Sequence, residues 1–508
     1  MNRRSFLRNT LAGTTAIAVT PSAFLASCGP DGTDALDKAL IGTVGGVNVV
    51  VPPLPFTTPF SAPQVKNASS VVVEASNNNT VLVGINQTFC YGYTSSIWGP
   101  TLKISAGNAA NITFENSINE NSNIHFHGLA LAANVDGNPD DVVSFGGSKS
   151  YAFDANSRAG LYWYHPQTER STGKQINLGL GGLFVIDGGE EGGLGLPNID
   201  ESIFLVLQDK RFNDSDTLFY GPSTAERIAG YFGEHMMVNG LIGPFKNVAT
   251  KVVRLRIVNA SNARIMNLGF DCDNPDFGNP TMIGNDGGLL PNSATSAQIM
   301  LAPGERIDLL VDFRPLNVGD IVTMKSKTFG GGGKYQGSES FEIMQFVVNN
   351  ATVDGYTIPG SLATIPVLTE ADATNTRSLD ISNKNINSDE AYNDPEHIHG
   401  INGDSYDPNV VNYTIDAGTT ELWEISNDGA DEPRAIHISG AKFQIISRVG
   451  GRDSVKQWEE GWKDTVLLLP DETVQIVIPF GMNLGKYFVY CTNLEMADSG
   501  LMHSYEIV

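Results

Sequence analysis

The chain has 508 residues and a formal net charge of −24 at pH 7. This negative charge argues against nucleic acid or an anionic membrane surface as a partner. The length is more than one hydrophobic core supports, so we expect two or three domains.

The first 28 residues are typical of an export signal. Residues 2–8, NRRSFLR, form a twin-arginine motif, and the weakly apolar stretch 11–25 follows it. This stretch is too short and too polar to span a bilayer stably. Residues 25–28, LASC, resemble a bacterial lipoprotein box, which predicts that Cys28 becomes the acylated N-terminus. The alternative is an ordinary cleaved signal in which Cys28 is incidental.

These features predict a periplasmic protein that crosses the inner membrane in the folded state. Gly29 after Cys28 favours the outer membrane as the place of the lipid anchor. No later segment has a run of about 20 apolar residues, so we expect contact with the membrane only through that anchor.

Three strand-rich blocks follow a tether. Residues 29–65 are rich in Gly, Pro and small residues and are predicted to be flexible. The blocks are predicted over residues 66–190, 199–350 and 366–508, with linkers at 187–198 and 351–365.

The pattern within the blocks predicts an all-β protein. Alternating or apolar runs at 182–186, 252–258, 307–312, 421–425 and 474–478 predict strands, and no helical periodicity is long enough to compete. The chain has 54 Gly and 25 Pro, as frequent turns require. We therefore predict three Greek-key β-sandwiches in series. Besides Cys28 there are only Cys90, Cys272 and Cys491, too few for a disulfide scaffold, although a Cys90–Cys272 bond stays open.

Four short motifs carry the candidate chemistry. Residues 124–128, IHFHG, place His125 and His127 on one face of a strand, which suits neighbouring metals. The other three motifs are 160–167 with His165, 436–440 with His437, and 487–502, YFVYCTNLEMADSGLM.

In this order and at these spacings, the four motifs resemble those of the three-domain, laccase-like multicopper oxidases. The resemblance spans nearly the whole chain after the signal. It implies an all-β fold of three consecutive cupredoxin-like domains. It also implies a mononuclear copper in the third domain, which takes electrons from substrate, and a trinuclear copper cluster between the first and third domains, which reduces oxygen.

The resemblance assigns the mononuclear copper to four positions. Cys491 matches the cysteine ligand, but Arg434 and Met496 stand where the two histidines belong, and Leu501 stands at the axial methionine. A guanidinium has no lone pair to offer copper. We therefore predict that this site is vestigial and that Cys491 is a small buried apolar residue.

The trinuclear cluster is matched only in part. His125 and His437 match the two ligands of its isolated copper. His127 and His165 match two of the three ligands of one copper in the coupled pair, and Thr492 replaces the third.

The remaining copper of the pair would rely on Gln167, Ser439 and Tyr490, none of them histidine. Two interpretations stay open: a filled cleft whose four histidines are hydrogen-bonded, or one Cu or Zn held by His125, His127, His165 and His437. Asp136 matches an acidic residue linked to proton delivery in the family, whereas Ala497 replaces a second one.

Other histidines are predicted to be unimportant for chemistry. His397 and His399 are predicted to be an exposed pair, His235 with Met236 and Met237 to pack in the core, and His503 to lie at the surface. The chain has no serine-nucleophile elbow, Walker loop or CxxC motif, which leaves other catalytic classes without support.

Two functions are compatible with these motifs. The first is an envelope protein that binds or scaffolds an unknown envelope protein or small molecule, with at most one bound metal. The family includes a twin-arginine-exported, copper-free member that supports cell division. The alternative is a copper-dependent oxidoreductase that uses a reduced copper centre. The full four-copper complement is not expected in either.

Overall fold

The computed structural model describes residues 43–44, 47–48, 56–83, 86–94, 97–213, 217–382 and 397–508. It divides into two compact units, Met1–Val49 and Val50–Val508. In the first unit, β1 (Thr43–Val44) pairs antiparallel with β2 (Val47–Asn48). The predicted export signal and Cys28 lie outside the described residues. Among the helices that are described, none has the length and apolar character needed to cross a bilayer.

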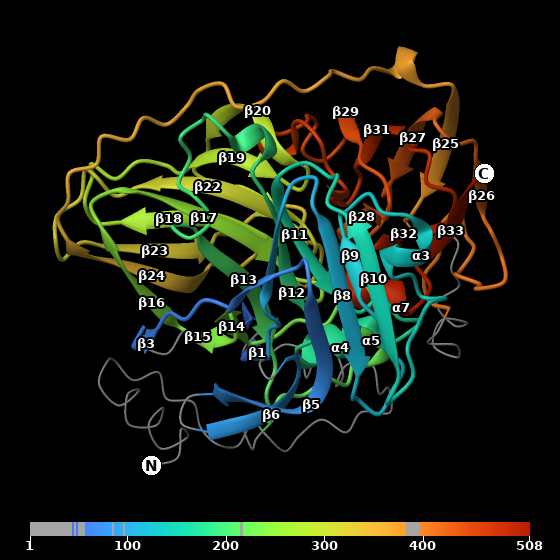
Figure 1. Cartoon of the computed structure of the whole chain (residues 1–508), viewed down its shortest axis with the longest axis horizontal. Coiled ribbons are helices and arrows are strands. Elements are labelled where there is room, and N and C mark those ends of the chain that lie inside the picture. Colours follow the sequence, from blue (N-terminus) through green and yellow to red (C-terminus); the bar gives the residue numbers. More distant parts are fainter. Residues whose placement is uncertain are drawn as a thin grey trace. The chain divides into compact units, whose positions relative to one another are not determined.

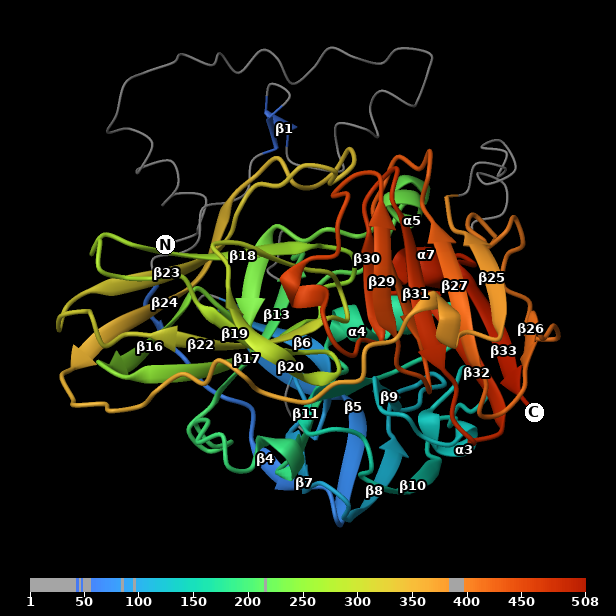
Figure 2. The ribbon, with the colours of Figure 1, turned by 90° about the horizontal axis from the view of Figure 1, so that it is seen from above.

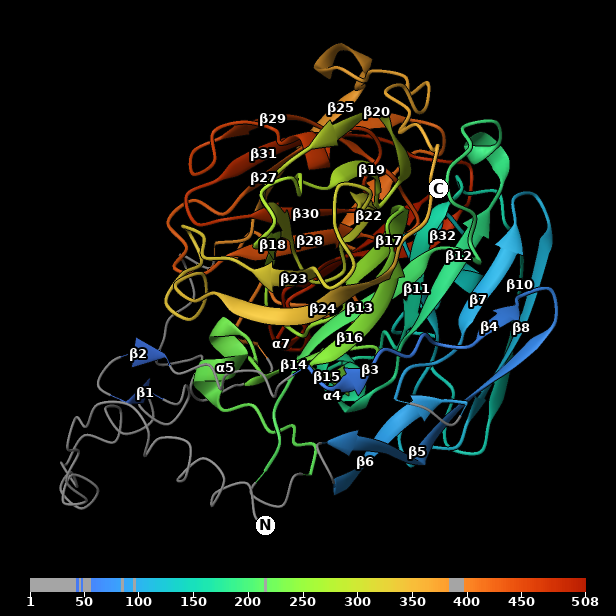
Figure 3. The ribbon, with the colours of Figure 1, turned by 90° about the vertical axis from the view of Figure 1, so that its left-hand side faces the viewer.

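The second unit is built almost wholly from β-strands, as predicted. Its first strand-rich block contains a four-stranded sheet, β10-β8-β5-β6, and a five-stranded sheet, β4-β7-β12-β11-β9 (Figure 3). Its elements are β4 (Val65–Asn67), β5 (Val71–Val83), β6 (Asn86–Tyr93), β7 (Thr101–Ser105), β8 (Ala109–Asn116), β9 (His125–His127), α3 (Ala133–Asp136), β10 (Ser148–Asp154), β11 (Gly160–His165), α4 (Thr172–Leu178) and β12 (Gly182–Asp187).

Burial along these strands follows their place in the block. In β8 buried and more exposed residues alternate, with Ala110, Ile112 and Phe114 turned to the core. Every residue of β11 is buried, because this strand packs on both faces.

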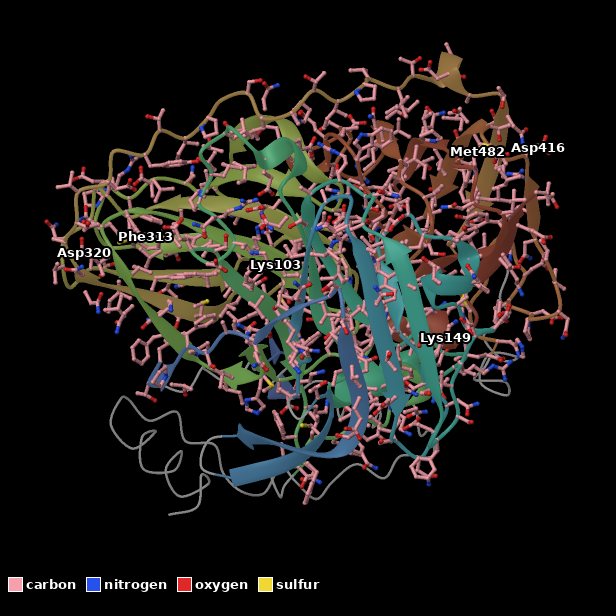
Figure 4. All side chains as sticks on the ribbon, in the orientation of Figure 1. Lys103, Lys149, Phe313, Asp320, Asp416 and Met482 are labelled. Atoms are coloured by element: carbon pink, nitrogen blue, oxygen red, sulfur yellow. The ribbon has the colours of Figure 1, made fainter. Side chains whose placement is uncertain are left out.

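The second block holds a seven-stranded sheet, β15-β14-β13-β17-β22-β19-β20, and a six-stranded sheet, β21-β18-β23-β24-β16-β3 (Figure 1). Phe313, labelled in Figure 4, is a fully buried member of its core. Its elements, with the 3₁₀ helix η3 that precedes it, are β3 (Thr58–Pro59), η3 (Gly189–Glu191), β13 (Ile203–Lys210), α5 (Thr224–Ala229), β14 (His235–Val238), β15 (Leu241–Ile242), β16 (Pro244–Ala249), β17 (Val252–Asn259), β18 (Met266–Cys272), β19 (Thr281–Asn285), β20 (Gly288–Thr295), β21 (Ile299–Leu301), β22 (Arg306–Asp312), β23 (Ile321–Ser326) and β24 (Phe341–Asn350).

The third block holds the sheets β25-β27-β31-β29 and β26-β33-β32-β28-β30. The strands of the first of these lie side by side in Figure 2. Its elements are η4 (Glu370–Asp372), β25 (Asn375–Asp380), β26 (Tyr413–Ile415), β27 (Thr420–Ser426), β28 (Arg434–Ile438), β29 (Gln444–Val449), η5 (Gln457–Glu459), β30 (Thr465–Leu468), β31 (Thr473–Pro479), β32 (Gly485–Cys491), α7 (Leu494–Asp498) and β33 (Met502–Ile507).

The structure bears on two expectations from the sequence, the possible Cys90–Cys272 disulfide and the flexible tether. Cys90 and Cys272 are free thiols, so the disulfide left open between them does not form. The segment predicted to be a flexible tether, residues 29–65, includes β3, and β3 pairs with β16. The end of that segment is thus part of a sheet.

A separate apolar cluster joins the first block to the second. Leu161, Trp163 and Ile176 from the first block pack with Phe204 and Val258 from the second. This contact covers the outer face of β11, the strand that ends in His165. The predicted block boundaries themselves stay a prediction.

Candidate metal centre

Strand pairing brings the four candidate histidines to one place. In the antiparallel pair β9–β11, His125 lies opposite His165 and His127 lies opposite Trp163. In the third block, β28 runs between β30 and β32, so that His437 lies opposite Thr465 on one side and Tyr490 on the other.

The four imidazoles form one buried cluster. The rings of His127 and His437 stack with centroids 3.7 Å apart, and the ring of His125 lies 5.3 Å from that of His165 and 5.8 Å from that of His437. Each of the four residues is at most 1% exposed. The cluster therefore joins the first block to the third.

His125 and His437 are oriented alike. Nδ1 of His125 donates to the carbonyl oxygen of Asp136, and Nδ1 of His437 to that of Asp464, both at 2.9 Å. With the proton on Nδ1, each Nε2 carries a lone pair. Neither Nε2 has a hydrogen-bond partner among the residues that the structure describes. Such buried, unpartnered nitrogens are suited to a metal.

A glycine allows α3 to hold His125. Gly137 ends α3 with φ +84°, and a Cβ there would lie 1.8 Å from the carbonyl oxygen of Ile124. Only glycine fits this close approach at a positive φ. The packing also places Oδ2 of Asp136 3.4 Å from Nδ1 of His125. Asp136 is thus beside the cluster, but its predicted role in proton delivery stays a prediction.

His127 and His165 are bonded to one another instead. Nδ1 of His165 donates to the carbonyl oxygen of Pro166 at 2.8 Å, so its Nε2 accepts from Nδ1 of His127 at 3.2 Å. Nε2 of His127 lies 3.1 Å from the Thr465 hydroxyl, which donates to Oδ1 of Asp464 at 2.9 Å. Each nitrogen of the two rings therefore has a polar neighbour.

Burial keeps these imidazoles neutral. It lowers the pKa of His437 and holds the pKa of His127 and of His165 well below their usual value, and neighbouring imidazoles and Arg306 act in the same direction. Neutral imidazole is the form that binds metals.

A buried carboxylate underlies the cluster. Oδ1 and Oδ2 of Asp464 accept from the two terminal nitrogens of Arg306 at 2.7 and 2.6 Å, and Lys442 donates to Oδ2. Burial alone would raise the pKa of Asp464, but Arg306 and Lys442 hold it well below its usual value. Oδ1 lies 3.4 Å from His127 Nε2 and from His437 Nδ1. The sequence interpretation missed Asp464, whose signal was a lone acid directly before an apolar strand.

By distance, the possible ligands fall into two overlapping sets. Nitrogens of His125, His127 and His165 lie within 4.8 Å of one another, and so do ligand atoms of His127, His437 and Asp464. These are the groups of three or more His, Cys, Asp or Glu found in the described part of the chain. The four predicted histidines are thus together, but they are arranged as two sets that share His127.

Comparison with known proteins identifies the fold family. The sequence profile described as multicopper oxidase matches residues 73–191, and a second profile of the same description matches residues 370–508. The chain belongs to the multicopper oxidase family. It is 30% identical over 435 residues to the multicopper oxidase mco of Staphylococcus haemolyticus, covering 85% of this chain and 86% of that protein.

Relatives of the multicopper oxidase family with another role match as well. The cell division protein FtsP of Escherichia coli strain K12 is 30% identical over 442 residues, which is 81% of this chain and 86% of that protein. Among solved structures, the McoA multicopper oxidase of Aquifex aeolicus has a TM-score of 0.80 at 28% identity and covers 89% of this chain and 100% of that chain. The cupredoxin-like fold predicted from the sequence is therefore confirmed.

Three residues predicted from the sequence to stand at copper-ligand positions of the cluster have other contacts. The Thr492 hydroxyl donates to the carbonyl oxygen of Ala435 at 3.3 Å, and that of Ser439 accepts from the amide of Phe488 at 3.0 Å. The Gln167 amide nitrogen lies 4.0 Å from the Met502 sulfur.

The four positions matched to the mononuclear copper lie in the core of the third block. Cys491, Met496 and Leu501 are fully buried there, and Arg434 is 5% exposed. Arg434 donates to Oδ1 of Asn427 at 2.7 Å. Burial raises the pKa of the Cys491 thiol to about 11, so that it stays protonated at neutral pH.

Two exposure predictions for other histidines are wrong. His399 is 1% exposed and its Nε2 bonds the carbonyl oxygen of Arg227 at 3.0 Å, although its neighbour His397 is exposed as predicted. His503 is 2% exposed, because β33 runs between β26 and β32 and the Tyr413 hydroxyl contacts Nδ1 at 2.9 Å. Met237 packs in the cluster between the blocks, and His235 is half-buried.

Proposed function

We propose that this member of the multicopper oxidase family is a binding or scaffold protein of the cell envelope that holds at most one metal. The observation that carries the proposal is Arg434, a buried cation at a position that the family fills with a copper ligand. A guanidinium cannot coordinate copper and repels it.

The environment of Cys491 supports the same conclusion. Its thiol is neutral and packed against Met496 and Leu501. A protein without the mononuclear copper has no centre to accept electrons from a substrate and pass them to oxygen. Four-copper turnover is then not available to this chain.

Similarity to a cell division protein favours a scaffold. FtsP of Escherichia coli and the mco of Staphylococcus haemolyticus are each 30% identical to this chain. We propose a comparable, non-catalytic role, with an envelope protein or a small molecule as the partner. The twin-arginine and lipoprotein motifs at residues 2–8 and 25–28 support a periplasmic location with an outer-membrane anchor at Cys28.

One metal fits the cluster better than three. The unpartnered Nε2 atoms of His125 and His437 supply two ready ligands, whereas Thr492 and Ser439 are engaged with the backbone. Copper there would supply one-electron chemistry, and zinc would supply a structural link. A reduced copper centre that oxidises a small substrate is the second candidate function, and the same two nitrogens are the observation that favours it.

The test is metal content. Purified mature protein is exposed to copper or to zinc, freed of excess metal and analysed for metal per chain, together with phenol oxidation. We expect at most one metal and no turnover. His125→Ala and His437→Ala should abolish binding, while Cys491→Ser, the matched control, should not. Three or four coppers with the intense blue absorption of a copper–thiolate bond would overturn the proposal. One copper with turnover would select the second candidate.

A further inference from the structure

A third unpartnered polar atom belongs to a ring that packs beside the two imidazoles with free nitrogens. The phenol oxygen of Tyr490 is buried and has no hydrogen-bond partner within the described ranges, like Nε2 of His125 and Nε2 of His437. Tyr490 itself is 1% exposed. Buried polar groups in native proteins nearly always have a partner, so three neighbouring exceptions call for one explanation.

The three rings contact one another. The Tyr490 ring lies 5.2 Å from that of His437 and 6.3 Å from that of His125, and the two imidazoles are 5.8 Å apart. All three contacts are close to edge-on, with interplanar angles of 68°, 72° and 69°. His437 and Tyr490 are also directly opposite in the pair β28–β32, which places their side chains on the same face of the sheet.

The other two histidines of the cluster have polar neighbours. His127 and His165 bond each other, and the Thr465 hydroxyl lies 3.1 Å from His127. The backbone holds Ser439 and Thr492. The carboxylate of Asp136, Nε1 of Trp163 and Oε1 of Gln167 also lack hydrogen-bond partners in the described residues, but the Tyr490 ring contacts both His125 and His437.

We propose that Tyr490 completes a metal site with His125 and His437, so that the ligands are two imidazole nitrogens and one phenolate oxygen. The inference rests on the proposed function, in which this cluster holds one metal. The phenol loses its proton to solvent as the oxygen–metal bond forms, and no electron is transferred. We assign divalent copper as the metal, because imidazole nitrogens together with an anionic oxygen suit it.

In this ligand set Tyr490 binds the metal itself, rather than only occupying the position of a histidine ligand of the family. His127 and His165, which the sequence matched to the same cluster, then support the site through their hydrogen bond rather than bind the metal. The site differs in its phenolate from one built on histidines alone. That difference has a spectroscopic consequence, since a phenolate bound to copper gives a visible charge-transfer band that imidazole does not.

The experiment is a titration of the full mature chain with copper(II), followed by absorption and resonance Raman spectroscopy. We expect one copper per chain, a visible band, and tyrosinate ring vibrations when that band is excited. Tyr490→Phe should remove the band and weaken copper binding at least about tenfold. The matched control is Tyr406→Phe, because the Tyr406 hydroxyl is also buried without a partner in the described residues but packs beside Phe488.

The outcomes separate this inference from the proposed function. One copper without tyrosinate vibrations, or an unchanged band in Tyr490→Phe, overturns the phenolate ligand and leaves the one-metal scaffold intact. No copper at all also overturns it, since water or side-chain movement then explains the three free donors. Three or four coppers with a blue thiolate band overturn the proposed function itself. The Raman measurement needs only the wild-type chain, so a variant that misfolds does not block the test.

Discussion

At the level of single residues, the proposal that the mononuclear copper is lost depends on Arg434 and Met496. Both are buried beside Cys491 in the third core. Replacing the two with histidine would supply the imidazoles that the family places around its cysteine. We expect the double variant Arg434→His, Met496→His to bind copper with the intense blue absorption of a copper–thiolate site, measured by absorption spectroscopy.

The control for this gain of function is the triple variant that also carries Cys491→Ser, which should stay colourless. Circular dichroism establishes that each variant is folded. A folded double variant that binds no copper would show that these positions do not correspond to the mononuclear ligands.

Asp464 is the second residue whose replacement should be severe. It is fully buried and accepts hydrogen bonds from Arg306 and Lys442, whose positive charges it balances. Asp464→Asn removes the main counter-charge of Arg306 and of Lys442, which costs about 3–5 kcal/mol. Denaturant unfolding measures the loss. The exposed Asp416, labelled in Figure 4, is the control, and Asp416→Asn should change stability by less than about 0.5 kcal/mol. Equal effects of the two changes would contradict a supporting role for Asp464.

At the scale of elements, α4 is held at both ends by other blocks. The amides of Thr172 and Gly173 at its start donate to Asp498 at 3.1 and 2.8 Å. The carbonyls of Ile176 and Asn177 at its end accept from Lys210 at 3.2 and 2.6 Å. These hydrogen bonds satisfy backbone groups that the two helix ends leave without intrahelical partners. Since α4 follows His165 closely in the chain, the contacts also fix one side of the cluster.

Two buried acids in α7 make this contact sensitive to pH. Burial is the main cause that raises the pKa of Glu495 to about 7 and that of Asp498 to about 8. Each folded pKa is above its unfolded value of about 4, so the folded state holds the extra protons, and stability falls as pH rises from about 4 and levels off above about 8. We expect the free energy of unfolding to drop by on the order of 7 kcal/mol between about pH 5 and pH 9.

The measurement is denaturant unfolding over that pH range. In the variant Glu495→Gln, Asp498→Asn the side chains cannot ionise, so the slope of stability against pH should flatten. The wild type and the double variant are compared at low pH, where their stabilities should be closest. A slope that persists in the double variant would place the pH dependence elsewhere.

At the scale of elements, the sequence predicted strands better than short helices. Alternating or apolar runs placed strands at 252–258, 307–312 and 421–425, and β17, β22 and β27 lie there. Period-two patterns report burial on one sheet face and are readable locally. The short helices α4 and α7, with at most 7 residues, were missed because so few turns show no helical period.

At the site too, local motifs could be read from the sequence, whereas contacts between distant residues could not. The motifs single out His125, His127, His165 and His437 because each has a characteristic strand context, and the structure places the four rings together. The Arg306–Asp464 ion pair joins residues 158 apart in sequence and has no local signal. Burial of His399 and His503 comes from strands and loops that pack over them, which a pattern of neighbours cannot reveal.

At the scale of the whole second unit, the cluster is where the blocks meet. His125 comes from the sheet of β9, His437 from the sheet of β28, and Arg306 reaches Asp464 from β22. A metal bound by both His125 and His437 would link two sheets that share no paired strands in the part of the chain that the structure describes. Binding to the folded state alone stabilises it by about 2.7 kcal/mol when free metal is 100 times Kd.

We therefore expect copper to raise the melting temperature by about 2–4 °C or more, measured by calorimetry with and without metal. His437→Ala removes one side of the link, so its melting temperature should not respond to copper. Cys491→Ser keeps both ligands and should respond like the wild type. Because the link joins the first block to the third, limited proteolysis should also slow at the junction when copper is bound. A melting temperature that rises equally in His437→Ala would mean that copper acts elsewhere on the surface, and the cluster would then serve packing alone.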